Sequence, residues 1–289
     1  MQDRYFRKGK ADDLMTLLSH ESAKASHYDY GAENYDVFNE KKSQQTNQTI
    51  ENILKKYNVK SVLDLTCGTG SQVFWLVKRK YEVTGSDISA NMLKVAKRKA
   101  RAENLDVKFL EGDMRTIQVG KFDAAITIFN AVGHLTKLDF EMAIRNIHNN
   151  LNEDGLYIFD IFNLSYLMKG NNITKLTIDW QSVTDDTKIR KIQYSTIDND
   201  GILASHTTSY SQKGSSPPKK ATGAKTLQTY SANQLKEMLH RNGFKVIDQC
   251  GIDGLKFSDS KSERIVMIAK KEGSVTEILT PCLAVSNTI

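Results

Sequence analysis

Short apolar runs alternate with amphipathic stretches along the first half of the chain. Five such runs predict strands, at residues 61–65, 81–86, 107–110, 122–129 and 156–160. Between them, apolar residues recur at the spacing of a helix that buries one face. Strands that alternate with helices in this way form parallel sheets that are covered on both faces. The pattern therefore predicts an α/β fold.

From about residue 170 the pattern changes to an alternation of apolar and polar residues. The alternation continues on both sides of a turn at 198–201, which predicts a β-hairpin. Two further strand-like runs, 244–248 and 265–269, come near the end of the chain. We therefore expect an antiparallel β insertion at about 173–230, after the fifth strand.

Residues 46–272 are expected to form one domain that contains this insertion. A polar N-terminal arm or lid at 1–45 precedes the domain, and a weakly patterned tail at 273–289 follows it. Within the insertion, residues 214–225 are predicted to form a loop because they begin with Gly-Ser-Ser-Pro-Pro. A strand-like stretch at 226–230 comes next.

The composition, with 39% hydrophobic and 26% charged residues over 289 positions, is that of a soluble globular protein. No apolar run approaches the ~20 residues of a membrane span, and no signal-peptide pattern opens the chain. The three cysteines and six histidines share no disulfide or metal-ligand spacing. We therefore expect a cytoplasmic protein without a metal site.

A net charge of +6 raises the question of a nucleic-acid partner. In the densest basic stretch, at 94–101, the cations lie on one helical face, and nearby apolar residues such as Met92 and Leu93 lie on the other. A solvated helix face explains this pattern better than a phosphate-binding patch does. Nucleic acid is therefore the less favoured partner.

The clearest motif is the segment 62–70, where an apolar run ends in Asp64 and breaks into a turn with Gly68 and Gly70. Glycines permit positive φ angles and a close approach of the backbone to a ligand. The next strand-like run ends in Asp87, where a carboxylate can accept hydrogen bonds from ribose hydroxyls. This spacing predicts a site for a nucleoside cofactor.

A dinucleotide is disfavoured because its fingerprint has a small residue at the position of Val73. Bulky apolar residues follow Val73, and the Gly-Lys-Ser/Thr sequence of a triphosphate-binding loop is absent from the chain. A cofactor without a pyrophosphate group fits this turn better.

The order and spacing of several residues resemble the motifs of the class I S-adenosylmethionine-dependent methyltransferases. These residues are Asp64, Gly68, Gly70, Asp87 and Gly112-Asp113. The resemblance extends over roughly residues 50–165 and the last two strands, with a departure at Thr66, where the family usually has glycine. It implies S-adenosylmethionine as the cofactor. It also implies a Rossmann-like, seven-stranded, mostly parallel sheet with helices on both faces, here with the antiparallel β insertion after strand five.

The resemblance also implies roles for individual residues. The backbone of 67–70 would approach the amino-acid part of the cofactor, Asp87 its ribose and Asp113 its adenine amino group, with Ile88 and Met92 beside the adenine ring. Taken alone, Asp87 could be a helix N-terminal acid and Asp113 a turn residue, but their joint spacing favours the cofactor roles. The cofactor-binding residues implied in this way are Asp64, Thr66, Cys67, Gly68, Gly70, Asp87, Ile88, Met92, Gly112, Asp113, Met114, Phe129 and Asn130.

A candidate catalytic base, His134, follows the fourth strand. Histidine commonly transfers protons near pH 7, and an amine must lose a proton before it can attack a methyl group. A similar Gly-His-Leu sequence occurs at this point in sugar N,N-dimethyltransferases, where the histidine is a proposed base. The related glycine N-methyltransferases also carry a histidine there. The alternative is that His134 caps or packs the following helix.

A second catalytic candidate, Tyr35, lies in the N-terminal arm close to Tyr28 and Tyr30. In the related N-methyltransferases an N-terminal segment folds over the site, and a tyrosine from it touches the sulfonium or the acceptor. The alternative is a hydrophobic staple beneath the arm. No arginine stands at 160–166, where glycine-methylating relatives place an arginine region for the carboxylate, and this weakens the case for an amino-acid substrate.

These observations predict methyl transfer from S-adenosylmethionine to a small-molecule acceptor, with an amine nitrogen favoured over oxygen. Enzymes that methylate exocyclic amines of bases usually carry Asn/Asp-Pro-Pro-aromatic after strand four, whereas here Asn130 is followed by Ala-Val. Methylation of RNA or protein by another route stays open because the chain is basic. A cofactor-binding protein of the same fold without catalysis is the remaining alternative.

Overall fold

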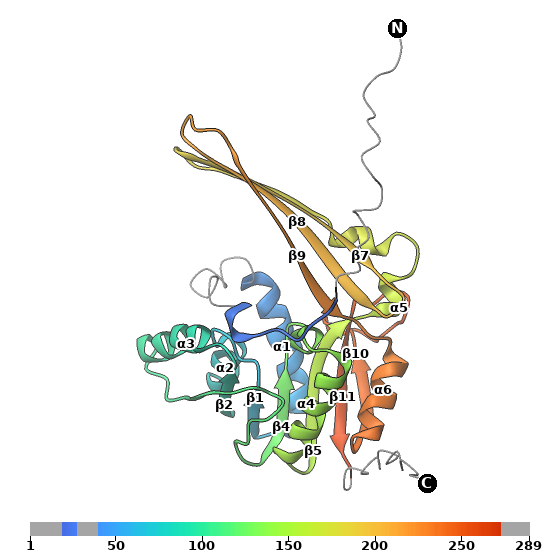
Figure 1. Cartoon of the computed structure of the whole chain (residues 1–289). Helices are drawn as coiled ribbons and strands as arrows, with labels where there is room; N and C mark the ends of the chain where they lie inside the picture. Colours follow the sequence, from blue (N-terminus) through green and yellow to red (C-terminus); the bar gives the residue numbers. More distant parts are fainter. Residues whose placement is uncertain (1–18, 28–39, 273–289) are drawn as a thin grey trace, which may run out of the picture.

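The computed structural model describes residues 19–27 and 40–272 (Figure 1). The strands of its main sheet are β1 (Ser61–Asp64), β2 (Glu82–Asp87), β3 (Lys108–Glu111), β4 (Phe122–Thr127), β5 (Leu151–Phe162), β10 (Phe244–Cys250) and β11 (Arg264–Lys271). They lie side by side in the order β10-β11-β5-β4-β1-β2-β3. β11 runs antiparallel to both of its neighbours, and β1 to β5 are parallel to one another. The predicted Rossmann-like, seven-stranded, mostly parallel sheet is confirmed.

The helices that cover this sheet are α1 (Glu40–Lys56), α2 (Ser71–Val77), α3 (Ala90–Ala102), α4 (Lys137–Asn149) and α6 (Ala232–Arg241). α4 and α6 pack on one face, where Phe140 and Leu235 contact the layer that contains Tyr157 of β5. α1 and α2 pack on the other face, against the layer that contains Ile158. Consecutive residues of β5 thus enter opposite cores, which explains why residues 156–159 are apolar at every position. Among these helices and the rest of the described chain, none is long and apolar enough to cross a membrane.

The predicted strand at 156–160 is the middle of a longer strand. β5 begins at Leu151, which pairs with Phe122 of β4, and the register shifts before Ala124. Asp154, within this irregular part, has a φ of 61°, the left-handed conformation of a turn residue. The turn-forming residues before 156 therefore produce an irregularity in the strand instead of ending it.

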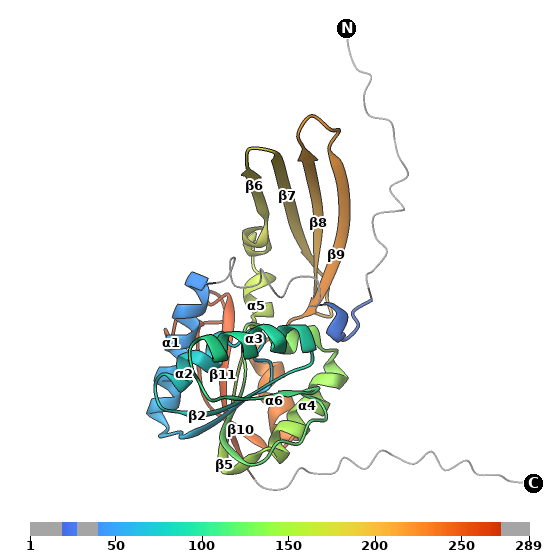
Figure 2. The same cartoon turned by 90° about the vertical axis from the view of Figure 1, so that its left-hand side faces the viewer.

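A second, antiparallel sheet follows β5. A short helix α5 (Leu164–Leu167) and a 3-10 helix η6 (Asn172–Leu176) lead into it. Its strands, in their order across the sheet, are β6 (Ile178–Val183), β7 (Thr187–Ile197), β8 (Ile202–Lys213) and β9 (Lys219–Gln228). The sheet projects away from the main body (Figures 1 and 2). At its base Leu203 packs on Tyr166 and Leu167. The four strands pair antiparallel, which confirms the antiparallel insertion predicted after strand five.

The structure corrects one part of this insertion: residues 219–225 belong to β9 and do not form the predicted loop. They pair with β8 in regular register, as Lys220 does with Tyr210. Most residues of β9 are exposed, so the strand lacks the alternation of apolar and polar residues by which a sequence reveals a strand. Its backbone pairing with β8 defines it instead.

The core beneath α4 provides a test of the packing. Phe140 is fully buried, and the centroid of its ring lies 5.5 Å from that of Phe159 and 5.7 Å from that of Tyr230. Phe140→Ala is expected to lower the free energy of unfolding by about 3–5 kcal/mol, because it removes these contacts and leaves a cavity. Leu138→Ala, on the same helix at a side chain that is 71% exposed, should change it by less than about 0.5 kcal/mol. Denaturant titration measures both values, and equal losses in the two variants would contradict this description of the core.

Candidate active site

A cavity of about 380 Å³ lies at the carboxyl ends of β1 to β4. This is the edge of an open α/β sheet at which ligands bind. The predicted cofactor-binding residues that line it are Asp64, Thr66, Cys67, Gly68, Asp87, Ile88, Met92, Gly112, Asp113, Met114, Phe129 and Asn130. Gly70 lies outside the lining set, and Tyr35 lies outside the described residues. One cavity therefore brings together residues from four separate strand ends.

The loop after β1 requires glycine at two positions, for different reasons. Gly68 has a φ of 51°, and a Cβ atom built on it would meet no heavy atom of the described chain within 4 Å, so its backbone faces open space. Gly70 has a φ of 92°, and its Cβ atom would lie 2.6 Å from the ring of Phe74. Gly68 therefore leaves room for a ligand, whereas Gly70 lets α2 begin close beneath the loop.

Asp87, at the tip of β2, holds this loop in place. Its Oδ2 atom accepts the backbone N–H of Gly68 at 2.8 Å, and its Oδ1 atom accepts that of Ser89 at 2.9 Å. Burial raises the pKa of Asp87, and these two hydrogen bonds oppose the rise. A carboxylate has about four lone-pair sites, so Asp87 can still accept hydrogen bonds from a ligand in the cavity that it lines.

Asp64, at the end of β1, is only 2% exposed. Burial raises its pKa to about 7; the backbone N–H of Thr66 lowers the pKa, and the nearby Asp87 carboxyl raises it further. A positively charged ligand in the cavity would favour the ionised form of Asp64. This end of the site is therefore suited to a cation.

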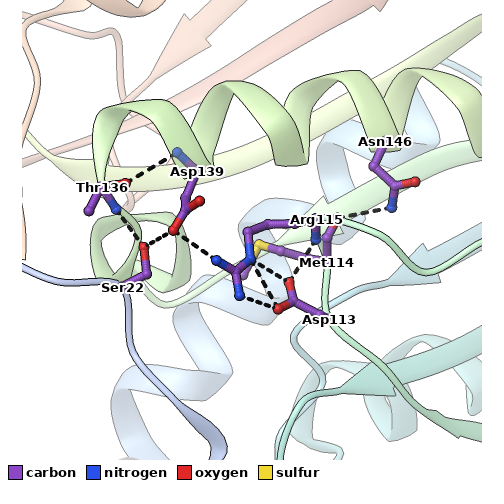
Figure 3. A network of polar contacts seen from close by, with 7 residues as sticks. All are labelled: Ser22, Asp113, Met114, Arg115, Thr136, Asp139 and Asn146. Carbon is purple, nitrogen blue, oxygen red and sulfur yellow. Dashed lines mark hydrogen bonds and ion pairs between the residues drawn. The ribbon is translucent and has the colours of Figure 1, made fainter.

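Asp113 is held by an arginine that the sequence prediction did not include (Figure 3). The Nε atom of Arg115 lies 3.0 Å from each carboxylate oxygen of Asp113, and its Nη1 atom donates to Asp139 of α4 at 2.8 Å. Burial alone would raise the pKa of Asp113, but the Arg115 guanidinium holds it below its usual range. Arg115 also lines the cavity. Arg115 comes two residues after Asp113, which is a signal in the sequence that it lies near the site. The sequence does not show that the Arg115 side chain folds back onto the Asp113 carboxylate.

The loop after β4, which lines the cavity through Phe129 and Asn130, is held by a buried carboxylate, that of Asp160 in β5. Its Oδ1 atom accepts the backbone N–H groups of Phe129, at 2.6 Å, and Asn130, at 3.3 Å. Both residues have positive φ angles, 65° and 60°, so these hydrogen bonds hold the loop after β4 in a strained shape. Asp160 also forms an ion pair with Arg264 of β11, which lines the cavity and which sequence reasoning missed.

His134 lines the same cavity. It ends the 3-10 helix η5 (Ala131–His134), which follows the loop held by Asp160. Its backbone carbonyl accepts the N–H of Ala23 at 2.8 Å. Ala23 belongs to residues 19–27, a segment that we call the strap and that ends in the 3-10 helix η2 (Ala25–His27). The strap therefore borders the cavity beside His134, with Leu135, Phe162 and Leu227 as apolar neighbours.

Several buried polar atoms of the cavity wall suit a polar ligand such as S-adenosylmethionine. Thr66 Oγ1, both amide atoms of Gln72 and Asn130 Nδ2 have no hydrogen-bond partner within the described part of the chain. Such buried groups cost about 1–3 kcal/mol each unless a ligand or water satisfies them. The cavity volume also falls in the range of about 300–1,000 Å³ that is usual for small-molecule sites. The wall therefore fits the cofactor that the motifs imply.

Comparisons with known proteins agree with this geometry. Residues 62–155 match the family described as "Methyltransferase domain". Over 77% of its length the chain is 24% identical to a candidate methyltransferase of Geobacillus sp. (strain WCH70), 90% of which it covers. The chain is an S-adenosylmethionine-dependent methyltransferase. S-adenosylmethionine is thus its cofactor, as predicted.

This methyltransferase is similar to two further proteins, one in sequence and one in fold. Half of the chain is 29% identical to a dTDP-3-amino-3,6-dideoxy-alpha-D-glucopyranose N,N-dimethyltransferase of Streptomyces fradiae, over 59% of that protein. The fold is similar to that of a crystal structure of an S-adenosylmethionine-dependent methyltransferase from Clostridium acetobutylicum ATCC 824. The TM-score is 0.69 and the identity 20%, and the match covers 86% of this chain and all of the other.

The raised pKa of Asp64 predicts a pH-dependent loss of stability. An unfolded aspartate has a pKa of about 3.9, whereas that of Asp64 in the folded protein is about 7. Between these values the unfolded chain releases a proton that the folded protein keeps, so the free energy of unfolding falls as pH rises. Relative to Asp64→Asn, the unmodified methyltransferase should therefore lose stability between pH ~4 and ~7.

Denaturant titrations of both proteins at several pH values measure this difference. Asp123→Asn is a control of opposite sign. Although burial acts to raise its pKa, hydrogen bonds from the Ser61 and Lys60 backbone hold the pKa of Asp123 below its usual value, so its contribution is lost only at acid pH. If the free energies of unfolding of the unmodified protein and Asp64→Asn differ by the same amount at every pH from ~4 to ~7, Asp64 is ionised in the folded protein over that range.

Proposed function

We propose that this methyltransferase transfers a methyl group to an amine nitrogen of a small molecule, with His134 as the base. The observation that carries the proposal is that His134 and all but one of the predicted cofactor-binding residues line one cavity. When bound, the cofactor supplies a methyl group on a positively charged sulfur. An acceptor amine is mostly protonated at neutral pH, and a histidine beside it can take the proton.

The walls around His134 suit a small acceptor. Leu135, Phe162 and Leu227 bring apolar side chains from three separate elements to this end of the cavity. Apolar walls exclude water, which would otherwise stabilise the protonated amine. Leu227 comes from β9, so the insertion forms part of the acceptor site. The name of the Streptomyces fradiae relative describes methylation of an amine, which also supports a nitrogen acceptor.

The basic stretch of α3 does not favour a nucleic-acid acceptor over this proposal. The buried residues of α3 are Met92, Leu93, Val95, Ala96 and Ala100, so most of its cations lie on the opposite, solvent-facing side. That arrangement is the one expected of a solvated helix face. RNA and protein acceptors are therefore tested as alternatives.

A transfer assay with isotope-labelled methyl groups tests the proposal. The panel contains small amines, amino acids, amino sugars and their nucleotide derivatives, RNA and a mixed peptide library. We expect incorporation into at least one small amine. Incorporation into RNA or peptides alone would replace the proposal with the macromolecular alternative, and cofactor binding without any incorporation would favour a non-catalytic protein.

His134→Gln tests the role of the base. Loss of a general base usually lowers kcat by about 10²–10⁴-fold, whereas the dissociation constant of the cofactor should stay nearly unchanged because the predicted cofactor contacts remain. His240→Gln is a matched control at an exposed position of α6, and it should leave both quantities unchanged. Steady-state kinetics and calorimetry provide the two measurements. Unchanged turnover in His134→Gln would remove His134 from the mechanism.

A further inference from the structure

The strap is held beside the candidate active site by hydrogen bonds from its side chains as well as from its backbone. The His20 ring contacts Thr226 of β9 through Nδ1, at 2.9 Å, and the Leu135 carbonyl through Nε2, at 3.0 Å. The Ser22 hydroxyl donates to Asp139 and accepts the backbone N–H of Thr136 at 2.9 Å. The strap therefore lies against the start of α4 and the base of the insertion.

A continuous polar network leads from Ser22 to the predicted adenine end of the cofactor site (Figure 3). Ser22 contacts Asp139, Asp139 contacts Arg115, and Arg115 contacts Asp113. The side chains of Arg115, Asp113 and Asp139 are 26, 22 and 21% exposed, so water screens these contacts only partly. One guanidinium thus separates two carboxylates that would otherwise repel each other.

Only an arginine can make this set of contacts. In its planar fork, Nε and Nη2 each donate to one oxygen of Asp113, while Nη1 donates to Asp139. A lysine ammonium is a single point charge and cannot present the same paired donors. The direction of the Asp113 carboxylate therefore depends on Arg115, and the direction of Arg115 depends on Asp139 and on the strap residue that contacts it.

We propose that Arg115 is a positioning residue that couples seating of the strap to occupation of the adenine end of the cofactor site. A cofactor that contacts Asp113 stabilises the orientation of Arg115 that holds Asp139, and Asp139 in that orientation holds Ser22. By linkage, a seated strap strengthens cofactor binding by the same factor. The seated strap also places the Ala23 N–H on the His134 carbonyl, so cofactor binding fixes the backbone of the proposed base.

A double-mutant cycle on cofactor affinity tests this coupling. Calorimetry with S-adenosylhomocysteine, the demethylated cofactor, gives dissociation constants for the unmodified enzyme, Ser22→Ala, Arg115→Gln and the double variant. Ser22 does not line the cavity, yet we expect Ser22→Ala to weaken binding about fivefold or more. In the Arg115→Gln background it should have no further effect. Equal weakening in both backgrounds, or none in either, overturns the proposal.

Asn146 provides a matched control. Its amide donates to the carbonyls of Met114, at 3.0 Å, and Ile117, at 2.8 Å, so it also joins α4 to the loop after β3 but makes no contact with the strap. The effects of Asn146→Ala and Ser22→Ala should therefore add. If Arg115→Gln does not fold, Asp139→Ala removes the group that accepts from both Ser22 and Arg115, and it takes the place of Arg115→Gln in the cycle.

Hydrogen exchange gives a second readout that needs no acceptor. The amide of Ala23 should exchange more slowly when S-adenosylhomocysteine binds to the unmodified enzyme, because the strap is then held more firmly. The slowing should disappear in Arg115→Gln at saturating ligand. The same slowing in both proteins overturns the coupling. Because neither experiment involves methyl transfer, each can be interpreted even if no amine acceptor is found.

Discussion

Aspartates at the strand ends shape the candidate active site by accepting backbone N–H groups from the loops that follow. The same short contact recurs at three neighbouring strands, where Asp64, Asp87 and Asp113 each accept the N–H of the residue two positions ahead. Such local hydrogen bonds favour a turn directly after a strand. Because β1, β2 and β3 are adjacent and parallel, the three turns lie at one edge and form one wall of the cavity.

A fourth aspartate, Asp160 of β5, holds the loop that follows the neighbouring strand β4. It accepts the N–H groups of Phe129 and Asn130 and pairs with Arg264, so it joins β4, β5 and β11 beside the cavity. Asp64, Asp87 and Asp113 line the cavity, and a carboxylate there suits a cofactor that carries a positive sulfonium. The two arginines of the wall are paired with acids, so each fixes the position of a carboxylate.

The insertion and the strap complete the cavity from outside the main sheet. Leu227 of β9 and Ala23 of the strap both line it, and His20 contacts Thr226 beside Leu227. This part of the cavity is therefore built from residues that lie far apart in the sequence.

The sequence by itself revealed the features that depend on local spacing. The apolar runs showed the strands, and the segment from Asp64 to Gly70 showed the cofactor loop, because turn-forming residues and periodicity act over a few positions. Local spacing failed at 219–225, where exposed residues form a strand only by pairing with β8.

Only the tertiary structure decided which distant side chains meet. Arg115 and Asp139 are 24 positions apart, and Ser22 and Asp139 are 117 positions apart. Arg264 reaches Asp160 because β11 inserts antiparallel beside β5. Such pairs depend on strand order and helix packing, and the spacing of residues along one chain does not contain that information.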